Sequence, residues 1–447
     1  MGKLFGTDGV RGLANRELTP MLAFKLGRAV GVKLINNSVQ SKPKVVIGKD
    51  TRISCGMLEA ALTAGFCSVG VDVVSLGVIP TPGVAYLTRV NDFAGGVVIS
   101  ASHNPASDNG IKFFGSNGYK LPDQVENEIE AVLFADDNSF PQPIGAEVGS
   151  VSYWPEGKSN YAHYLKTSID NDFSGLKIVL DCANGATSQL APQLFKELGA
   201  EVILVAAEPN GVNINLDCGS THLDLLSQQV VDHGAHLGLA FDGDGDRVLA
   251  VDHLGSLIDG DQILLMLANY FKENERLKNN ILVVTVMSNL GLHQAAKKLT
   301  IDILETKVGD RYVLEEMQKS DAIIGGEQSG HIILLNYNTT GDGMLTGLQL
   351  ISLLVAKGSS LKEEAAIMER LPQVLVNVPV KDKRNLNNND EINRVIDEVS
   401  TVLKDRGRLL VRPSGTEPLV RVMAEGPNEQ ELQQLVGKVA EAIKTSI

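Results

Sequence analysis

Short apolar runs rich in β-branched residues recur along the chain, and each ends in a polar turn that contains Gly or Asn. Three of them, starting at residues 44, 177 and 281, read KVVIGKDTR, KIVLDCANGAT and ILVVTVMSNLG. A helix-like stretch and then a second apolar run follow each one. Strands that alternate with amphipathic helices are typical of βαβ units and mostly parallel sheets. The repeated pattern, with little residue identity, predicts three α/β domains of related architecture.

The C-terminal end of the chain has a different pattern. The strand-like runs PQVLVNVPVKDK and RLLVRPSGTEPLVRVMAEG alternate with helices expected near 390–405 and from 428. This order predicts a smaller α+β domain. The fold class is therefore α/β, with three related domains of mixed, mostly parallel sheets and a small C-terminal α+β domain around a central cleft. The expected domain boundaries are 1–155, 156–254, 255–368 and 369–447.

The composition and the net charge limit the kinds of molecule that we expect the protein to bind. Of the 447 residues, 43% are hydrophobic and 21% charged, which is ordinary for a globular α/β protein. A net charge of −14 disfavours a broad nucleic-acid or anionic membrane surface, so we expect neither partner. No apolar run approaches the roughly 18 residues of a membrane span, and MGKLFGTDGVRG lacks the apolar core of a signal peptide. The four cysteines form no C-x-x-C pair, so we expect a reduced, cytoplasmic protein.

The stretch DGDGDR carries three carboxylates at alternate positions: Asp242, Asp244 and Asp246. Gly243 and Gly245 let the backbone curl so that the carboxylates converge, which suits a hard divalent cation such as Mg²⁺ or Ca²⁺. An EF-hand is excluded, because Arg247 and His253 stand where its loop needs Gly and Glu. A solvated acidic turn is the alternative. The flanking apolar runs HLGLAF and VLAVD favour the metal site.

The stretch ISASHNPASDNGIKFFGSNG follows the apolar run AGGVVIS. Ser102 therefore lies just past the C-terminal end of a predicted strand, where open α/β sheets place their ligand sites. His103 and Asn104 supply further polar groups, and Lys112 follows in the same stretch. An ordinary loop is the alternative, because Ser, Asn, Pro and Gly are common loop residues.

Two later stretches combine glycine turns with groups that bind sugars or phosphate. GGEQSGHI places Glu327 and Ser329 close together, and a carboxylate beside a hydroxyl suits the vicinal hydroxyls of a sugar. RPSGTEP resembles an anion cradle, because arginine binds phosphate through two hydrogen bonds and a glycine turn exposes N–H groups. A tight hairpin and a surface turn are the respective alternatives.

One polar, glycine-containing loop thus falls in each predicted domain. A single site at the junction of four domains requires this distribution, and ligand sites at domain interfaces are common. Two smaller stretches fit either a structural or a functional role: FGTDGVRG with Arg11, and TKVGDRYV with Lys307 and Arg311.

The motifs SASHNP, DGDGDR, GEQSGH and RPSGTEP, in this order and spacing, resemble those of the α-D-phosphohexomutase family over the whole chain. FGTDGVRG and GGEQSGH are most similar to the bacterial members that act on glucosamine phosphates. The resemblance implies interconversion of glucosamine 6-phosphate and glucosamine 1-phosphate, which feeds UDP-N-acetylglucosamine and cell-wall precursor synthesis. It also implies a phosphoserine, a hexose bisphosphate as intermediate or activator, and Mg²⁺ as cofactor. The oligomeric state, a homodimer included, is left open.

The resemblance further implies a role for each motif. Ser102 corresponds to the serine that carries the phosphoryl group, and Lys112 and His331 are the candidates for the general acid and base. Arg11 and Arg247 are implied as further catalytic residues. The implied Mg²⁺ ligands are Asp242, Asp244 and Asp246, together with the phosphate on Ser102. The implied substrate contacts are Glu327 and Ser329 for the sugar, and the loop of Arg412, Ser414, Gly415, Thr416 and Arg421 for the phosphate.

Charge balance supports this interpretation independently. A phosphoserine adds about −1.5 to −2 to three aspartates, and a divalent cation offsets only part of that charge. Nearby cations are therefore needed, and Lys112, Arg247 and Arg11 are available. Two other classes remain. A metal-dependent phosphatase leaves RPSGT unexplained, and a non-catalytic sugar-phosphate sensor has no use for three aspartates beside a serine.

Overall fold

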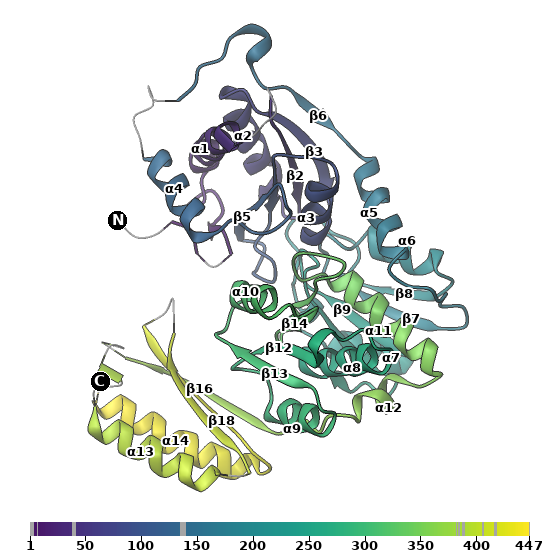
Figure 1. Ribbon diagram of the computed structural model, residues 1–447, viewed down its shortest axis with the longest axis vertical. Coiled ribbons are helices and arrows are strands. Elements are labelled where there is room, and N and C mark those ends of the chain that lie inside the picture. Colours follow the sequence, from purple (N-terminus) through teal and green to yellow (C-terminus); the bar gives the residue numbers. More distant parts are fainter. Residues whose placement is uncertain are drawn as a thin grey trace. The chain divides into compact units, whose positions relative to one another are not determined.

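The computed structural model describes residues 4–6, 8–37, 42–134, 140–380, 382, 385, 386, 389–404, 406–414 and 418–446. The chain forms two compact units: Met1–Val286 with Ile303–Ala365, and Met287–Asp302 with Ala366–Ile447. Figure 1 shows the elements of both. In the described ranges, no helix is both long enough and apolar enough to cross a membrane.

The N-terminal part of the first unit is a six-stranded sheet with helices on both faces. Its elements are β1 (Val10–Leu13), α1 (Pro20–Asn37), β2 (Lys44–Lys49), α2 (Ser54–Ser68), β3 (Asp72–Val78), α3 (Thr81–Val90), β4 (Gly95–Ile99), β5 (Asp108–Gly115), α4 (Asp123–Leu133) and β6 (Val151–Tyr153). The strand order is β1-β5-β4-β2-β3-β6, and only β5 runs antiparallel to its neighbours β4 and β1. Val45 and Ile47 of β2 pack with α1 and α2, whereas Val46 between them packs with α3.

A second sheet follows in the same unit. Its elements are α5 (Glu156–Lys166), β7 (Lys177–Asp181), α6 (Leu190–Glu197), β8 (Glu201–Val205), α7 (Asp224–Asp232), β9 (Leu237–Phe241), β10 (Val248–Asp252) and β11 (Leu257–Ile258). The order is β11-β10-β9-β7-β8. Strands β7, β8 and β9 are parallel, and β10 turns back antiparallel to β9. The β9–β10 turn is the DGDGDR stretch, so the aspartates lie at the carboxyl end of a buried strand.

A third sheet completes the first unit. Its elements are α8 (Gly260–Glu273), β12 (Ile281–Thr285), β13 (Asp302–Thr306), α10 (Asp310–Ser320), β14 (Ile324–Gly326), β15 (Ile332–Leu334), α11 (Gly343–Lys357) and α12 (Leu361–Ala365). The order is β13-β12-β14-β15, with β14 and β15 forming an antiparallel hairpin. A capping box of Asp259 and Gln262 begins α8, and the Asp342 carboxylate caps α11.

The second unit is an antiparallel sheet with helices on one face. Its elements are α9 (Leu290–Lys298), β16 (Gln373–Pro379), α13 (Asp390–Leu403), β17 (Arg408–Pro413), β18 (Leu419–Glu425) and α14 (Glu429–Ser446). The order is β16-β18-β17, and α13 and α14 lie along one side of this sheet (Figure 1). Val420 and Val422 of β18 share one core with residues of α13 and α14. Helix α9 joins this unit because the N–H of Leu290 donates to the buried Glu425 carboxylate at 3.2 Å.

The predicted fold class is confirmed. The runs at 44, 177 and 281 are β2, β7 and β12, and the helices α2, α6 and α9 follow them. The two helices predicted near the C-terminus are α13 and α14. The domain boundaries and the arrangement around a central cleft stay predictions.

Candidate active site

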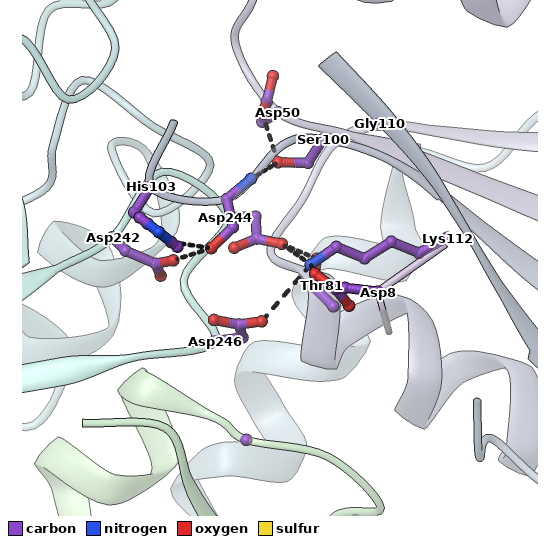
Figure 2. A network of polar contacts seen from close by, with 12 residues as sticks. Asp8, Asp50, Thr81, Ser100, His103, Gly110, Lys112, Asp242, Asp244 and Asp246 are labelled. Carbon is purple, nitrogen blue, oxygen red and sulfur yellow. Dashed lines mark hydrogen bonds and ion pairs between the residues drawn. The ribbon is translucent and has the colours of Figure 1, made fainter. Parts of the chain in front are cut away.

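Ser102 lies in the loop after β4. A buried polar network that includes Asp50 and Ser100 fixes the backbone there (Figure 2). Its φ is 52°, in the left-handed region that a non-glycine residue adopts only under constraint. The Ser102 N–H donates to Ser100 Oγ at 2.9 Å, and Ser100 Oγ donates to Asp50 Oδ2 at 2.5 Å. Buried Arg52 pairs with Asp50 at 2.8 Å and donates to the carbonyls of Ser102 at 3.0 Å and Asn104 at 2.8 Å. These contacts hold the serine in one geometry.

The three aspartates of DGDGDR converge as predicted. One carboxylate oxygen from each lies within 4.8 Å of the others, and all three side chains are buried. Gly245 adopts a φ of 70° in the turn that brings them together. Ser102 Oγ donates to Asp242 Oδ2 at 2.5 Å, so the serine lies against this cluster. Among the described residues, Oδ1 of Asp244 and Oδ1 of Asp246 have no hydrogen-bond partner. Buried, convergent carboxylate oxygens of this kind fit a divalent metal ion.

Lys112 is the main counter-charge of the cluster (Figure 2). Its Nζ lies 2.9 Å from Asp244, 3.0 Å from Asp8 and 3.6 Å from Asp246. Burial opposes the charged form, but the carboxylates outweigh it and raise the pKa of Lys112. For Asp242 the surroundings disfavour the charged form, because burial and repulsion from Asp246 and Asp244 raise the pKa of its carboxyl group.

His331 and Arg247 approach the cluster from the other side. His331 Nδ1 lies 3.6 Å from Asp246 Oδ1, and its Nε2 accepts the Gly341 N–H at 3.1 Å. The Arg247 N–H donates to Asp242 Oδ1 at 3.2 Å, and its guanidinium lies 3.8 Å from Asp246. Burial opposes protonation of His331, but Asp246 raises its pKa above the ordinary value. Arg247 therefore presents positive charge to the aspartates, whereas the ring of His331 is held by the Gly341 N–H at Nε2.

Two other predicted groups lie beside this cluster. Arg11 forms an ion pair with Asp8, which in turn contacts Lys112. His103 Nδ1 lies 3.3 Å from Ser102 Oγ. Burial, together with the positive charges of Arg247 and Arg11, lowers the pKa of His103 to about 4, so this ring is neutral beside the serine.

Glu327 and Ser329 lie at the tip of the β14–β15 hairpin. The hairpin alternative for GGEQSGHI is correct as a description of the backbone, and it is compatible with a binding role for the tip. Glu327 Oε1 accepts the Gly309 N–H at 3.1 Å. Ser329 Oγ is buried and has no hydrogen-bond partner in the part of the chain that the structure describes. Its hydroxyl is thus a buried polar group whose hydrogen-bonding capacity is unused within the described structure.

The predicted phosphate loop belongs to the second unit. Arg412 of β17 pairs in register with Arg421 of β18, and Ser414 is buried where β17 ends. Burial and repulsion from Arg421 lower the pKa of Arg412, and its Nε has no hydrogen-bond partner within the described ranges. Two neighbouring guanidinium groups are a suitable anion site. Gly415 and Thr416 lie outside the described residues.

Several residues around the cluster carried no prediction. They are Asp8, Asp50, Arg52, Thr81, Lys120, Asn215 and Asp310. Thr81 donates to Asp244 Oδ2 at 2.6 Å, and Asn215 donates to the Ser102 carbonyl at 2.9 Å. A signal existed for Asp50 and Arg52, which follow β2 at a strand end as Ser102 follows β4. Arg311 pairs instead with Asp123 and Glu126 of α4, in a structural contact.

Comparison with protein families agrees with this fold. Four models of phosphoglucomutase/phosphomannomutase match in succession: alpha/beta/alpha domain I at residues 2–140, domain II at 159–255, domain III at 259–371 and the C-terminal domain at 375–442. The chain therefore belongs to the phosphoglucomutase/phosphomannomutase family, the α-D-phosphohexomutases, and the resemblance seen in its motifs is confirmed.

Relatives within the family are similar over the full length. The chain is 56% identical to the phosphoglucosamine mutase of Desulforamulus reducens and 55% identical to that of Geobacillus thermodenitrificans, in each case over 99% of both chains. A phosphoglucomutase/phosphomannomutase family protein of Burkholderia thailandensis has a similar structure, with a TM-score of 0.84, 25% identity and coverage of 99% and 97%. The N-acetylphosphoglucosamine mutase of Aspergillus fumigatus, solved with GlcNAc-6P and magnesium, shares the fold, with a TM-score of 0.70, 19% identity and coverage of 99% and 95%.

Proposed function

We propose that the protein interconverts glucosamine 6-phosphate and glucosamine 1-phosphate, with Mg²⁺ as cofactor and Ser102 as the phosphoryl carrier. Full-length identity above 50% to phosphoglucosamine mutases supports the substrate. The observation that carries the proposal is the position of Ser102 Oγ, 2.5 Å from Asp242 in a buried cluster of three aspartates. A serine in that position is suited to hold a phosphate that shares a cation with the aspartates.

The reaction has two matched transfers. In the first, the bond between phosphorus and Ser102 Oγ breaks while a bond to a sugar hydroxyl oxygen forms. The hydroxyl proton leaves to a base, the serine oxygen is protonated, and the product is a hexosamine bisphosphate. After the sugar turns around, its other phosphate returns to Ser102 by the same steps. The transition state of such transfers is loose, so positioning and charge stabilisation are the main contributions of the protein.

The residues of the first unit have distinct parts in this scheme. Lys112, with Nζ among three carboxylates, supplies positive charge beside Ser102, and Arg247 and Arg11 supply more. Lys112 and His331 are the proposed acid–base residues. Held by Asp242, Asp244, Asp246 and a phosphate oxygen on Ser102, Mg²⁺ would neutralise charge on the transferring group.

Two loops bind the sugar phosphate in this proposal. Glu327 and Ser329 contact sugar hydroxyls, supported by the unpartnered Ser329 Oγ in the described structure. The phosphate that is not being transferred binds the second-unit loop of Arg412, Ser414, Gly415, Thr416 and Arg421. The paired guanidinium groups of this loop support the assignment and disfavour a simple phosphatase, which needs no second phosphate site.

The remaining assignments follow from the same proposal. The domains at 1–155, 156–254, 255–368 and 369–447 would carry the phosphoserine, the metal site, the sugar loop and the phosphate loop. We propose a cytoplasmic location and a hexose bisphosphate as intermediate or activator. We also propose no nucleic-acid or membrane partner, which the net charge of −14 supports. A homodimer is compatible with all of these.

A coupled assay tests the function. Purified protein is given Mg²⁺, a trace of hexose bisphosphate and the 6-phosphate of glucosamine, glucose or mannose, and the 1-phosphate product is measured. We expect glucosamine phosphate to give the highest kcat/KM, with weaker turnover of glucose phosphate. Release of inorganic phosphate without isomerisation, or a preference for mannose phosphate, would contradict the proposal.

A further inference from the structure

Five charged side chains and His331 form a closed ring beside the candidate active site. In order, the ring runs through Asp246, His331, Asp310, Lys120, Asp8 and Lys112, and returns to Asp246. His331 lies 3.6 Å from Asp246 and 3.7 Å from Asp310. Lys120 forms ion pairs with Asp310 and Asp8, and Lys112 lies 3.0 Å from Asp8 and 3.6 Å from Asp246. Acidic groups alternate with basic ones throughout.

Lys120 and Asp310 are the members of the ring farthest from the aspartate cluster. Lys120 follows β5 of the first sheet, and Asp310 begins α10, which belongs to the third. Their side chains are only 12% and 16% exposed, so the pair is largely shielded from water. Burial lowers the pKa of Lys120, but Asp310 and Asp8 outweigh it and raise the pKa to about 12. Breaking such a shielded pair from one side leaves a charge without its partner.

Each end of this ion pair is connected to a different part of the reaction site. Asp310 directly follows Gly309, whose N–H donates to Glu327 Oε1 at 3.1 Å. On the other side, Lys120 holds Asp8, which contacts both Lys112 and Arg11. The ion pair therefore joins the segment that orients the sugar-loop carboxylate to the segment that orients the cations beside Ser102.

We propose that Lys120 and Asp310 are positioning residues for phosphoryl transfer, and that their ion pair sets the spacing between Glu327 and the Ser102–Lys112 side of the site. This inference rests on the proposed function. Neither residue contacts Ser102 or the three aspartates directly. Their effect is on geometry, and a displacement of about 1 Å between reacting groups can cost about 100-fold in rate.

The chain offers a matched control on the same helix. Arg311, the next residue of α10, pairs with Asp123 and Glu126 of α4 and so also links the third sheet to the first part of the unit. It takes no part in the ring and does not hold Glu327. Its guanidinium also donates to the Leu121 carbonyl, next to Lys120, at 3.0 Å. Loss of the Arg311 side chain therefore removes links between the same two parts, one of them beside Lys120, while every ion pair of the ring stays in place.

The test compares Lys120→Met, Asp310→Asn, Lys120→Arg and Arg311→Met in the full-length protein. The measurements are kcat and KM for glucosamine 6-phosphate, the thermal midpoint, and phosphorylation of Ser102 by hexose bisphosphate, followed by intact mass. We expect Lys120→Met and Asp310→Asn to lower kcat by about 10- to 100-fold with KM within about threefold of wild type. Lys120→Arg should recover most of the rate. Arg311→Met should keep the wild-type kcat even where its thermal midpoint falls.

Three results would overturn the inference. The first is a folded Lys120→Met or Asp310→Asn enzyme with wild-type kcat. The second is an Arg311→Met enzyme that loses as much kcat as these two, which would make the effect one of general stability. The third is loss of rate in proportion to loss of folded protein. Asp310→Asn keeps the side-chain shape and so remains informative if Lys120→Met does not fold. Failure of the proposed function would appear separately, as absence of isomerisation by the wild-type protein.

Discussion

The carboxylates of Asp242, Asp244 and Asp246 repel one another in a buried loop. Lys112 offsets part of the repulsion, yet burial and the two neighbouring carboxylates still raise the pKa of Asp242. Oδ1 of Asp244 and of Asp246 has no hydrogen-bond partner among the described residues. At the scale of single residues, the cluster therefore fits a divalent cation.

Mg²⁺ is expected to stabilise the fold as well as support the reaction. A ligand that binds only the folded state stabilises it by about 2.7 kcal/mol at 100 times its Kd. The thermal midpoint should thus keep rising with the logarithm of the Mg²⁺ concentration above the Kd, and return to its starting value with EDTA. Asp244→Asn should lose most of this shift, whereas Asp232→Asn, at an exposed position of α7, should keep it. Scanning fluorimetry across a Mg²⁺ titration measures both, and a midpoint indifferent to Mg²⁺ would refute the metal site.

The sequence predicts residues whose role follows from local pattern. Ser102 and the aspartates could be found because each follows an apolar strand in a glycine-containing turn. The partners that hold them could not. Lys120 and Asp310 are 190 positions apart, and the local sequence around neither residue indicates the other as its partner. Only the fold brings such charges together.

Helices α1 and α2 approach so closely that glycine is required between them. A Cβ on Gly65 would lie 2.2 Å from the carbonyl oxygen of Phe24, and one on Gly27 would lie 2.4 Å from that of Leu62. No side chain fits in these two places. The two helices together cover one face of the sheet that carries Ser102, so their spacing supports that domain.

Gly65→Ala is expected to lower the free energy of unfolding by about 1–3 kcal/mol, because the added methyl meets backbone that cannot move aside alone. Gly56 supplies the control on the same helix, since a Cβ there has no neighbour within 4 Å. Gly56→Ala should be stabilising by up to about 1 kcal/mol, as expected for helix propensity. Urea unfolding of both variants measures the difference. Equal stabilities would show that the helices do not approach this closely.

At the scale of elements, the sequence predicts where strands and helices occur better than it predicts the direction in which each strand runs. The apolar runs of β2, β7 and β12 and the helices after them are clear from the sequence. Strands β5, β10 and β15 turn back antiparallel to a neighbour in their sheets. An apolar run alone does not encode this direction, because buried strands have the same composition in both arrangements.

At the scale of the whole molecule, the proposed function uses groups from both compact units. Ser102 and the aspartates belong to the first unit, and the Arg412–Arg421 pair belongs to the second. Under the proposed function, the arginines bind the phosphate that is not being transferred. That contact is equal in ground state and transition state, so its loss chiefly raises KM.

Arg421→Ala is therefore expected to raise KM for glucosamine 6-phosphate severalfold or more, while Ser102 still accepts phosphate from hexose bisphosphate. Some loss of kcat would follow if the phosphate contact also drives closure of the site. Arg406→Ala is the control, because Arg406 lies in the same unit and pairs with Glu431 at the surface. Steady-state kinetics with saturating bisphosphate compare the two. An Arg421→Ala enzyme with unchanged KM and kcat would show that the RPSGT stretch is a surface turn and does not bind the substrate phosphate.

The most direct test of the central claim is the phosphate on Ser102 itself. Intact-mass and peptide mass spectrometry should find one phosphoryl group on Ser102 after incubation with hexose bisphosphate and none on the Ser102→Ala variant. Addition of glucosamine 6-phosphate without bisphosphate should remove that group within a turnover and yield glucosamine bisphosphate, and the variant should lose nearly all isomerase activity. A phosphate on another residue, a Ser102 phosphate that does not respond to the sugar phosphate, or normal turnover by Ser102→Ala would contradict the account.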